Sequence, residues 1–156
     1  MAQGILIAVE GADKAGKHTQ SVKMVEYLRA RSIAAELFGY PQYGDWFGKM
    51  AKDYLNGRFG PTRNLPAEYT MLPYALDRWS SSARVNEWLD SGRVVVLDRY
   101  VYSNVFSVAK TPRDGWAEKI DWLEDLEFNQ LGLRRPDLNI YLSLPAAVSY
   151  EMRNSG

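Results

Sequence analysis

A glycine-rich loop between an apolar run and a helical pattern constrains most strongly how this chain can fold. The apolar run Ile5 to Val9 predicts a short buried strand. Gly11-x-x-x-x-Gly16-Lys17 follows at once, and a helical pattern then runs from Thr19 to about Arg31. Glycines let such a loop curl so that backbone N–H groups face phosphate oxygens, and the start of the next helix adds unpaired donors. The sequence therefore predicts a nucleotide-phosphate site, with Lys17 reaching the β- and γ-phosphates.

The residue after the loop lysine departs from the usual motif. Magnesium takes oxygen ligands, and a Ser or Thr hydroxyl is usual at this place, whereas this chain has His18 followed by Thr19. Either Thr19 supplies the hydroxyl, or the metal is held elsewhere through water. Asp98, which follows a later strand, is the carboxylate that can hold Mg²⁺ directly or through water.

Strands and helices alternate along the rest of the chain. We expect further strands at Ala34–Phe38, Val94–Leu97 and Leu138–Leu144, and helices at 47–55, Ala67–Leu89, Trp116–Leu131 and from Ala146 to Met152. Pro73 should kink or divide the helix in which it lies. The alternation predicts a three-layer α/β/α fold of the P-loop NTPase type, with a parallel sheet of which four strands can be recognised.

Length and composition favour one soluble domain covering residues 1–156. Nineteen basic residues balance nineteen acidic ones, so no overall charge attracts nucleic acid or anionic lipid. The chain has no cysteine, a single histidine (His18) and no apolar stretch of membrane-spanning length. These features predict a cytoplasmic enzyme that binds neither nucleic acid nor a membrane.

Charged and aromatic side chains follow the predicted strands. Ligands of parallel sheets bind beyond the carboxyl ends of the strands, so we expect Gly11–Thr19, Gly39–Tyr43 and Asp98–Phe106 to form one crevice. Arg99 can bind a second phosphate there, and Lys14 can neutralise charge in a transition state. A base pocket needs aromatic faces and a few polar groups. Its candidates, each of which can instead be core or surface, are Tyr40, Tyr43, Tyr74, Phe106, Asp77, Arg78, Ser103 and Asn104.

No general base stands out among these residues. An alcohol nucleophile would need a carboxylate to take its proton, whereas an ionised phosphate oxygen needs only cations. The cations would be Mg²⁺ and, from this chain, Lys17, Lys14 and Arg99. The pattern indicates a nucleoside monophosphate kinase.

With these residues in place, the chain resembles the thymidylate kinase family, whose members phosphorylate dTMP with ATP. The resemblance covers nearly the whole chain and is carried by Glu10-Gly-x-Asp13-x-Ala-Gly-Lys17-x-Thr19, Tyr40-Pro41-x-Tyr43, Tyr74-Ala-Leu-Asp77-Arg78, Asp98-Arg99-Tyr100-x-x-Ser103-Asn104 and Glu127-Phe128-x-x-Leu131-Gly-Leu-x-x-Pro136-Asp137. It implies ATP and dTMP as substrates, Mg²⁺ with ATP as phosphoryl donor, a role in dTTP biosynthesis, and a homodimer formed through helix faces.

The resemblance also implies roles for single residues. Tyr74 stacks on thymine, Arg78 and Asn104 bind its edge, and Pro41 lies beneath it. Asp13 lies near the sugar 3′-hydroxyl, and Arg99 with Tyr43 holds the dTMP phosphate. The remaining dTMP contacts fall to Tyr40, Ser103 and Phe106. The ATP set is Gly11, Ala12, Asp13, Lys14, Ala15, Gly16, Lys17, His18, Thr19 and Arg153, which packs on adenine; the catalytic set is Lys17, Lys14, Asp13 and Arg99; the metal set is Asp98 and Thr19.

The chain departs from the family pattern in two further places. The aromatic that packs on deoxyribose in relatives aligns with Ser107, and Phe106 stands one residue earlier. The family continues beyond Gly156 through a lid, a strand and a helix, so we expect a fragment. Two alternatives stay open: a deoxynucleoside kinase with Glu10 or Asp98 as base, and a nucleotide-binding module without catalysis. The guanine signature Asn-Lys-x-Asp of a GTPase does not occur.

Overall fold

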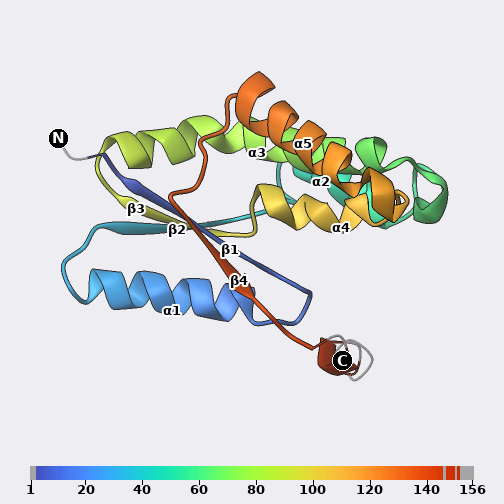
Figure 1. Cartoon of the computed structure of the whole chain (residues 1–156). Coiled ribbons are helices and arrows are strands. Elements are labelled where there is room, and N and C mark those ends of the chain that lie inside the picture. Colours follow the sequence, from blue (N-terminus) through green and yellow to red (C-terminus); the bar gives the residue numbers. More distant parts are fainter. Residues whose placement is uncertain (1–2, 146, 150, 152–156) are drawn as a thin grey trace. The chain divides into compact units, whose positions relative to one another are not determined.

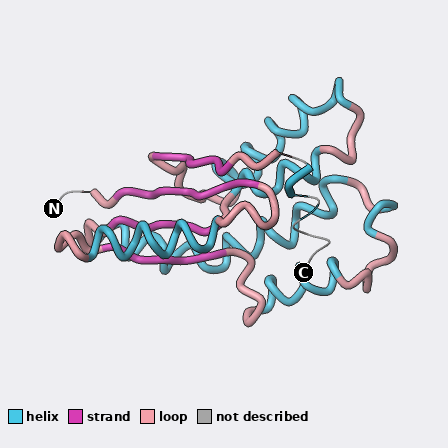
Figure 2. Tube along the Cα trace, turned by 90° about the horizontal axis from the view of Figure 1, so that it is seen from below, coloured by secondary structure: helices cyan, strands magenta, loops and turns pink. Residues whose placement is uncertain are grey.

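The glycine loop lies at the carboxyl end of an inner strand in a parallel four-stranded sheet. In the computed structural model, which describes residues 3–145, 147–149 and 151, the strands are β1 (Ile5–Gly11), β2 (Ala35–Gly39), β3 (Val94–Asp98) and β4 (Leu138–Leu142). Their order is β2-β3-β1-β4, and every neighbouring pair is parallel. Figure 2 draws the strands in magenta, running side by side. Val9 pairs with Asp98, so β1 and β3 end at the same edge of the sheet. The predicted parallel α/β architecture is confirmed.

The chain divides into two compact units. We call residues 1–39, 85–100 and 136–156 the sheet unit, and residues 40–84 and 101–135 the helical unit. None of the helices in the described part of the chain is long and apolar enough to cross a bilayer.

Helices cover both faces of the sheet unit. Helix α1 (Lys17–Arg29) lies along one face, and residues 85–90 of helix α3 (Ala67–Asp90) lie on the other (Figure 1). Under α1 the core is formed by Val9, Val25, Ala35 and Val96, all nearly inaccessible to water. Because β1 and β3 are buried on both faces, their sequences are continuous apolar runs and do not alternate.

The edge strand β4 is fixed to β1 at its first residues. The carboxylate Oδ2 of Asp137 accepts a hydrogen bond from the backbone N–H of Leu6 at 2.8 Å, and the Asp137 N–H donates to the Leu6 carbonyl at 2.9 Å. Ile7 then pairs with Leu138, which sets the register of the whole strand.

The helical unit contains α2 (Trp46–Leu55), most of α3, α4 (Val105–Val108), α5 (Trp116–Glu124), the π-helical turn η4 (Asp125–Gln130) and three 3₁₀ turns, η1 (Thr62–Asn64), η2 (Val101–Asn104) and η3 (Arg113–Gly115). Ala51 and Tyr54 of α2 pack against Tyr74 of α3 in its core, with Leu65 alongside. The helix expected over 47–55 is present, and Ala51 and Tyr54 of its predicted apolar face are buried, whereas Leu55 of that face is exposed.

Some element boundaries differ from those that the sequence predicts. The helix expected over 116–131 is α-helical only to Glu124 and continues as a π-helical turn, in which Glu127 is buried. Pro73 lies inside α3, which runs unbroken from Ala67 to Asp90, so of the two expected outcomes the division of the helix does not occur. Strand β4 ends at Leu142, ahead of a proline that cannot donate to a ladder. Residues 147–149 are helical as expected, whereas 146, 150 and 152 lie outside the described residues.

Candidate active site

Three residues in the left-handed region shape the loop after β1. Gly11 has φ 147°, Lys14 φ 66° and Gly16 φ 84°. At Gly11 a Cβ atom would also lie 2.6 Å from the Leu142 carbonyl oxygen, so both the backbone and the space require glycine. The N-cap of α1 is Gly16, which has no side chain that could cap the helix. The first-turn N–H groups of α1 are therefore directed at the loop without a capping side chain, which is the arrangement that binds anions.

Lys17 is folded over this loop. Its Nζ donates to the carbonyl oxygens of Gly11 at 2.8 Å and Ala12 at 2.6 Å, and the side chain is nearly inaccessible. Burial lowers the pKa of Lys17, and the positive charge of Arg99 lowers it further, whereas nearby carboxylates raise it. Two cations thus interact at the ends of neighbouring strands, and an anion bound there would relieve their repulsion.

Arg99 links the loop to the end of β3. Its Nη2 donates to Oδ1 of Asp13 at 2.6 Å, and its backbone N–H donates to the Val9 carbonyl at 3.0 Å. The backbone of Arg99 has φ 71°, which is strained for a residue with a Cβ. The sequence predicted that Asp13, Lys17 and Arg99 would come together, and within the sheet unit they do.

The expected metal residues lie beside these cations. Nδ1 of His18 lies 3.1 Å from Oδ2 of Asp98; the imidazole is 76% exposed and the carboxylate 17%. Thr19 is exposed on the first turn of α1. Among the described residues no group of three or more acidic, histidine or cysteine side chains gathers as a metal site. Asp98 and Thr19 supply only oxygen, which suits Mg²⁺ if phosphate and water complete its shell.

Glu10 belongs to the same strand ends and is held by the backbone. It is 4% exposed, and its Oε1 accepts a hydrogen bond from the Tyr100 N–H at 2.9 Å. The carboxylate therefore fixes the backbone on which Asp98 and Arg99 stand.

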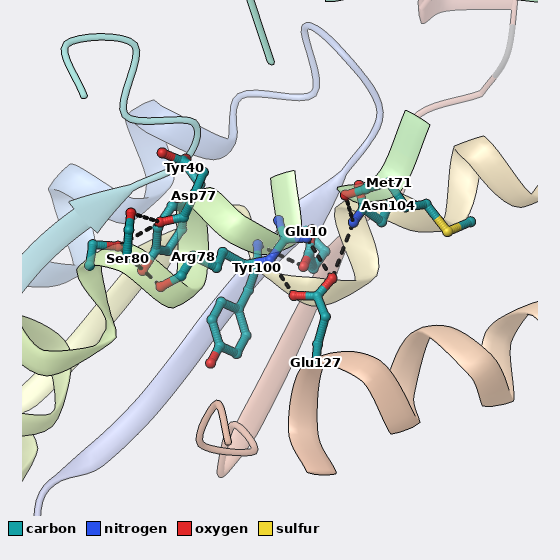
Figure 3. Close-up of polar contacts among 10 residues, drawn as sticks. Glu10, Tyr40, Met71, Asp77, Arg78, Ser80, Tyr100, Asn104 and Glu127 are labelled. Atoms are coloured by element: carbon teal, nitrogen blue, oxygen red, sulfur yellow. Dashed lines mark hydrogen bonds and ion pairs between the residues drawn. The ribbon is translucent and has the colours of Figure 1, made fainter. Parts of the chain in front are cut away.

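A buried ion pair organises the polar residues of the helical unit. Arg78 donates through Nε and Nη2 to the two carboxylate oxygens of Glu127, at 2.5 and 2.6 Å, as Figure 3 shows. Nδ2 of Asn104 donates to Oε1 of Glu127 at 3.1 Å and to the Met71 carbonyl at 3.3 Å. Arg78, Asn104 and Glu127 are each at most 2% exposed. The sequence predicts roles for Arg78 and Asn104 but none for Glu127, although an acidic residue between Leu126 and Phe128 is a signal for one.

The turn around Pro41 is fastened to α3 within the helical unit. The Tyr40–Pro41 peptide bond is cis, and the Tyr40 hydroxyl accepts a hydrogen bond from Ser81 at 3.0 Å. Burial raises the pKa of Tyr40 to about 12. Oδ2 of Asp77 accepts the N–H of Gln42 at 2.9 Å, while its buried Oδ1 has no partner among the described residues. Burial raises the pKa of Asp77, and a neutral acid would relieve that cost.

The aromatic candidates differ in exposure. Tyr74 is 9% exposed and meets Tyr54 edge to face, with ring centroids 6.2 Å apart, so most of its surface belongs to the core. Tyr43 and Phe106 are 45% and 61% exposed, whereas Ser107 is buried. Half-buried positions are found for Pro41 and Ser103, and Arg153 lies outside the described residues. That these residues form one crevice with the phosphate loop stays a prediction.

The parallel sheet, the glycine loop between β1 and α1, and the lysine folded over that loop define a protein of the P-loop NTPase class. The family model for thymidylate kinase matches residues 9–155. The chain belongs to the thymidylate kinase family.

Single relatives agree with this assignment. The chain is 34% identical to the thymidylate kinase of Homo sapiens over 146 residues, which are 93% of this chain and 63% of the human protein. It is 32% identical over 148 residues to that of Schizosaccharomyces pombe, covering 94% and 64%. The structure of thymidylate kinase from Candida albicans superposes with a TM-score of 0.75 at 27% identity, over 97% of this chain and 68% of that one. The chain thus spans less than two thirds of the human and fission-yeast proteins.

Proposed function

We propose that this chain transfers the terminal phosphoryl group of Mg-ATP to dTMP, giving dTDP for dTTP biosynthesis. The observation that carries the proposal is the placement of two cations at the glycine loop: Nζ of Lys17 lies on the Gly11 and Ala12 carbonyls, and Arg99 is joined to the loop through Asp13. Two anionic substrates would satisfy them, one on each cation. Membership of the thymidylate kinase family supports dTMP as the acceptor.

In the proposed reaction the loop amides and Lys17 hold the ATP phosphates, and Arg99 holds the phosphate of dTMP. Asp13 orients Arg99 through their ion pair and lies near the 3′-hydroxyl. Lys14 neutralises charge that develops on the transferred group. The acceptor oxygen is already ionised, so no side chain has to take its proton. Mg²⁺, held by Asp98 and Thr19, would supply charge neutralisation on the phosphates when it is bound.

The ATP set proposed for the loop is Gly11, Ala12, Asp13, Lys14, Ala15, Gly16, Lys17, His18 and Thr19, with Arg153 for adenine. For dTMP it is Asp13, Tyr40, Pro41, Tyr43, Tyr74, Arg78, Arg99, Ser103, Asn104 and Phe106. The burial of Tyr74 is compatible with stacking only if one face of its ring meets the base.

Nothing observed favours the deoxynucleoside kinase alternative. A base for an alcohol would have to be Glu10 or Asp98. Glu10 is buried and holds the Tyr100 N–H, and Asp98 is paired with His18. Neither carboxylate is placed as an exposed proton acceptor.

We further propose that the two units act as one kinase domain over 1–156, in the cytoplasm and as a homodimer. The lack of cysteine suits a reducing compartment. Apolar side chains exposed on α2 and α3 of the helical unit support association through these helices: Trp46, Leu55, Tyr69, Leu72 and Trp79. Sedimentation equilibrium tests the dimer, and a monomer mass at micromolar concentration would contradict it.

The activity is tested by measuring ADP formed from Mg-ATP with dTMP, dUMP, UMP, dAMP or thymidine, while titration calorimetry measures dTMP binding separately. We expect turnover selective for dTMP. Turnover with thymidine instead would favour the nucleoside kinase. Binding of dTMP without turnover would favour the non-catalytic module, and no binding would contradict the proposal.

A further inference from the structure

Glu127 is a fully buried charge to which the proposed reaction assigns no task. It lies in the π-helical turn η4, and its carboxylate points at Arg78 and Asn104 (Figure 3). A buried carboxylate is costly unless both of its oxygens are bonded. Here Oε2 accepts from Nε of Arg78 at 2.5 Å, and Oε1 accepts from Nη2 at 2.6 Å and from Asn104 at 3.1 Å. One carboxylate therefore holds both residues that are proposed to bind the base.

The contact with Glu127 fixes the orientation of the Asn104 side-chain amide, that is, the positions of its Nδ2 and Oδ1 atoms. The Nδ2 group faces Oε1 of Glu127 at 3.1 Å and the Met71 carbonyl at 3.3 Å. Both partners are acceptors only, so an inverted amide would place Oδ1 against two oxygens. With the two Nδ2 hydrogens directed at these oxygens, the remaining polar atom of the Asn104 side chain is an acceptor, Oδ1.

Arg78 offers the complementary group. A guanidinium carries donors only, and the two-point contact with Glu127 fixes its plane. An acceptor beside a donor matches the N3–H and O4 of thymine or uracil. Cytosine reverses both groups, with an acceptor at N3 and an amino donor at C4. Guanine shares the thymine order of groups but differs in size.

We propose that Glu127 is a positioning residue that sets base specificity: by fixing the Asn104 amide and the Arg78 guanidinium, it selects keto pyrimidines over cytosine. This inference rests on the proposed function, since it takes Arg78 and Asn104 as the residues that read the base. Glu127 itself touches no substrate.

The test compares Glu127→Gln and Glu127→Asp by calorimetric titration with dTMP, dUMP and dCMP. Gln has the shape of Glu, but one of its two ends donates. In the place of Oε1 that end opposes both Nη2 of Arg78 and Nδ2 of Asn104, so the Asn104 amide can invert; in the place of Oε2 it opposes Nε of Arg78 and frees the plane of the guanidinium. We expect the ratio of the dCMP Kd to the dTMP Kd to fall about tenfold or more, the cost of one charge-assisted hydrogen bond. The Kd of ATP should stay as in the wild type. Asp keeps two acceptor oxygens, so it should preserve the ratio even where both affinities weaken.

A second measurement uses the wild-type protein, in case Glu127→Gln shows no cooperative thermal transition. In ¹⁵N NMR spectra the Asn104 side-chain amide protons should be protected from exchange before any nucleotide is added. Rapid exchange would overturn the inference.

The outcomes separate the inference from the proposed function. Wild-type protein that does not bind dTMP contradicts both. Wild-type protein that prefers dTMP over dCMP, with an unchanged ratio in Glu127→Gln, contradicts only the role of Glu127, which would then be structural.

Discussion

Arg99 has a strained backbone and a proposed contact with the substrate. Comparing Arg99→Gly with Arg99→Ala separates the two effects, because both variants lose the contact and only glycine relieves the strain. At φ 71° a residue with a Cβ costs about 1–2 kcal/mol, which Arg99→Gly would remove and Arg99→Ala would keep. Glycine offsets about 0.5–1 kcal/mol of this gain in stability, because its unfolded chain is more flexible and loses more conformational entropy on folding. Both variants lose the ion pair with Asp13, which is 65% exposed and contributes at most about 1 kcal/mol. The glycine variant should therefore be more stable than the alanine variant by about 0.5–1 kcal/mol, or roughly 2 °C in Tm.

Activity should respond differently from stability. Each variant loses a charged hydrogen bond to the acceptor phosphate, about 1.5–3 kcal/mol, so the KM for dTMP should rise about tenfold to a hundredfold or more. The KM for ATP should change much less, and Arg99→Lys, which keeps the charge, should recover part of the loss. The assay is ADP formation at saturating ATP with dTMP varied, together with thermal melts followed by circular dichroism. Equal Tm values for the glycine and alanine variants would refute the strain argument. A larger rise in the KM for ATP than for dTMP would refute the role of Arg99.

Three further changes test other parts of the structure. Gly48→Ala would place a Cβ 1.8 Å from the Gln42 carbonyl oxygen, so the free energy of unfolding should fall by about 1–3 kcal/mol; an unchanged urea midpoint would contradict the close contact. Burial raises the pKa of Asp77 in the folded protein, so its ionisation lowers stability once the pH exceeds the unfolded pKa, and this loss is complete above the folded pKa. Asp77→Asn should therefore gain stability relative to the wild type between pH 4 and pH 8 in urea titrations, and a difference that moves the other way would oppose this sign. His18→Ser releases Asp98 and supplies a hydroxyl after Lys17. The free energy of unfolding should change by no more than about 0.5 kcal/mol, because the imidazole is 76% exposed. The Mg²⁺ concentration that gives half-maximal activity should fall, because Mg²⁺ prefers oxygen ligands. An unchanged or higher Mg²⁺ requirement would count against Asp98 as a metal residue.

The sheet could be predicted because its signals are local. Val95, Val96 and Leu97 are inaccessible, and a strand buried on both faces must read as an apolar run whatever else the chain does. The π-helical turn could not be predicted in this way. In this turn Glu127 is buried against Arg78, which lies 49 residues earlier in the sequence. Helical periodicity reports only on neighbouring residues and cannot reveal such a contact.

The contact between Asp13 and Arg99 could be predicted from the sequence, whereas the roles of the predicted site residues stay predictions. Asp13 and Arg99 stand at the ends of paired strands, so the parallel topology alone brings them together. The contact between His18 and Asp98 is not predicted by the sequence, because the two residues lie 80 positions apart and the motif indicates only a place for His18 in the phosphate loop. Tyr74 shows a further limit, since an aromatic side chain can serve a core or a ligand, and its edge-to-face contact with Tyr54 is set by tertiary packing.

The order β2-β3-β1-β4 has a consequence for the chain during its synthesis. Strand β1 is made first, yet Ile5 pairs with Val94 and Leu6 hydrogen-bonds to Asp137, so neither edge of this apolar strand finds its native neighbour early. At 5–20 residues per second the ribosome needs roughly 5–20 s to reach β3. Through that interval β1 emerges as a hydrophobic strand with two open edges, which is the form of nascent chain that aggregates or is bound by chaperones.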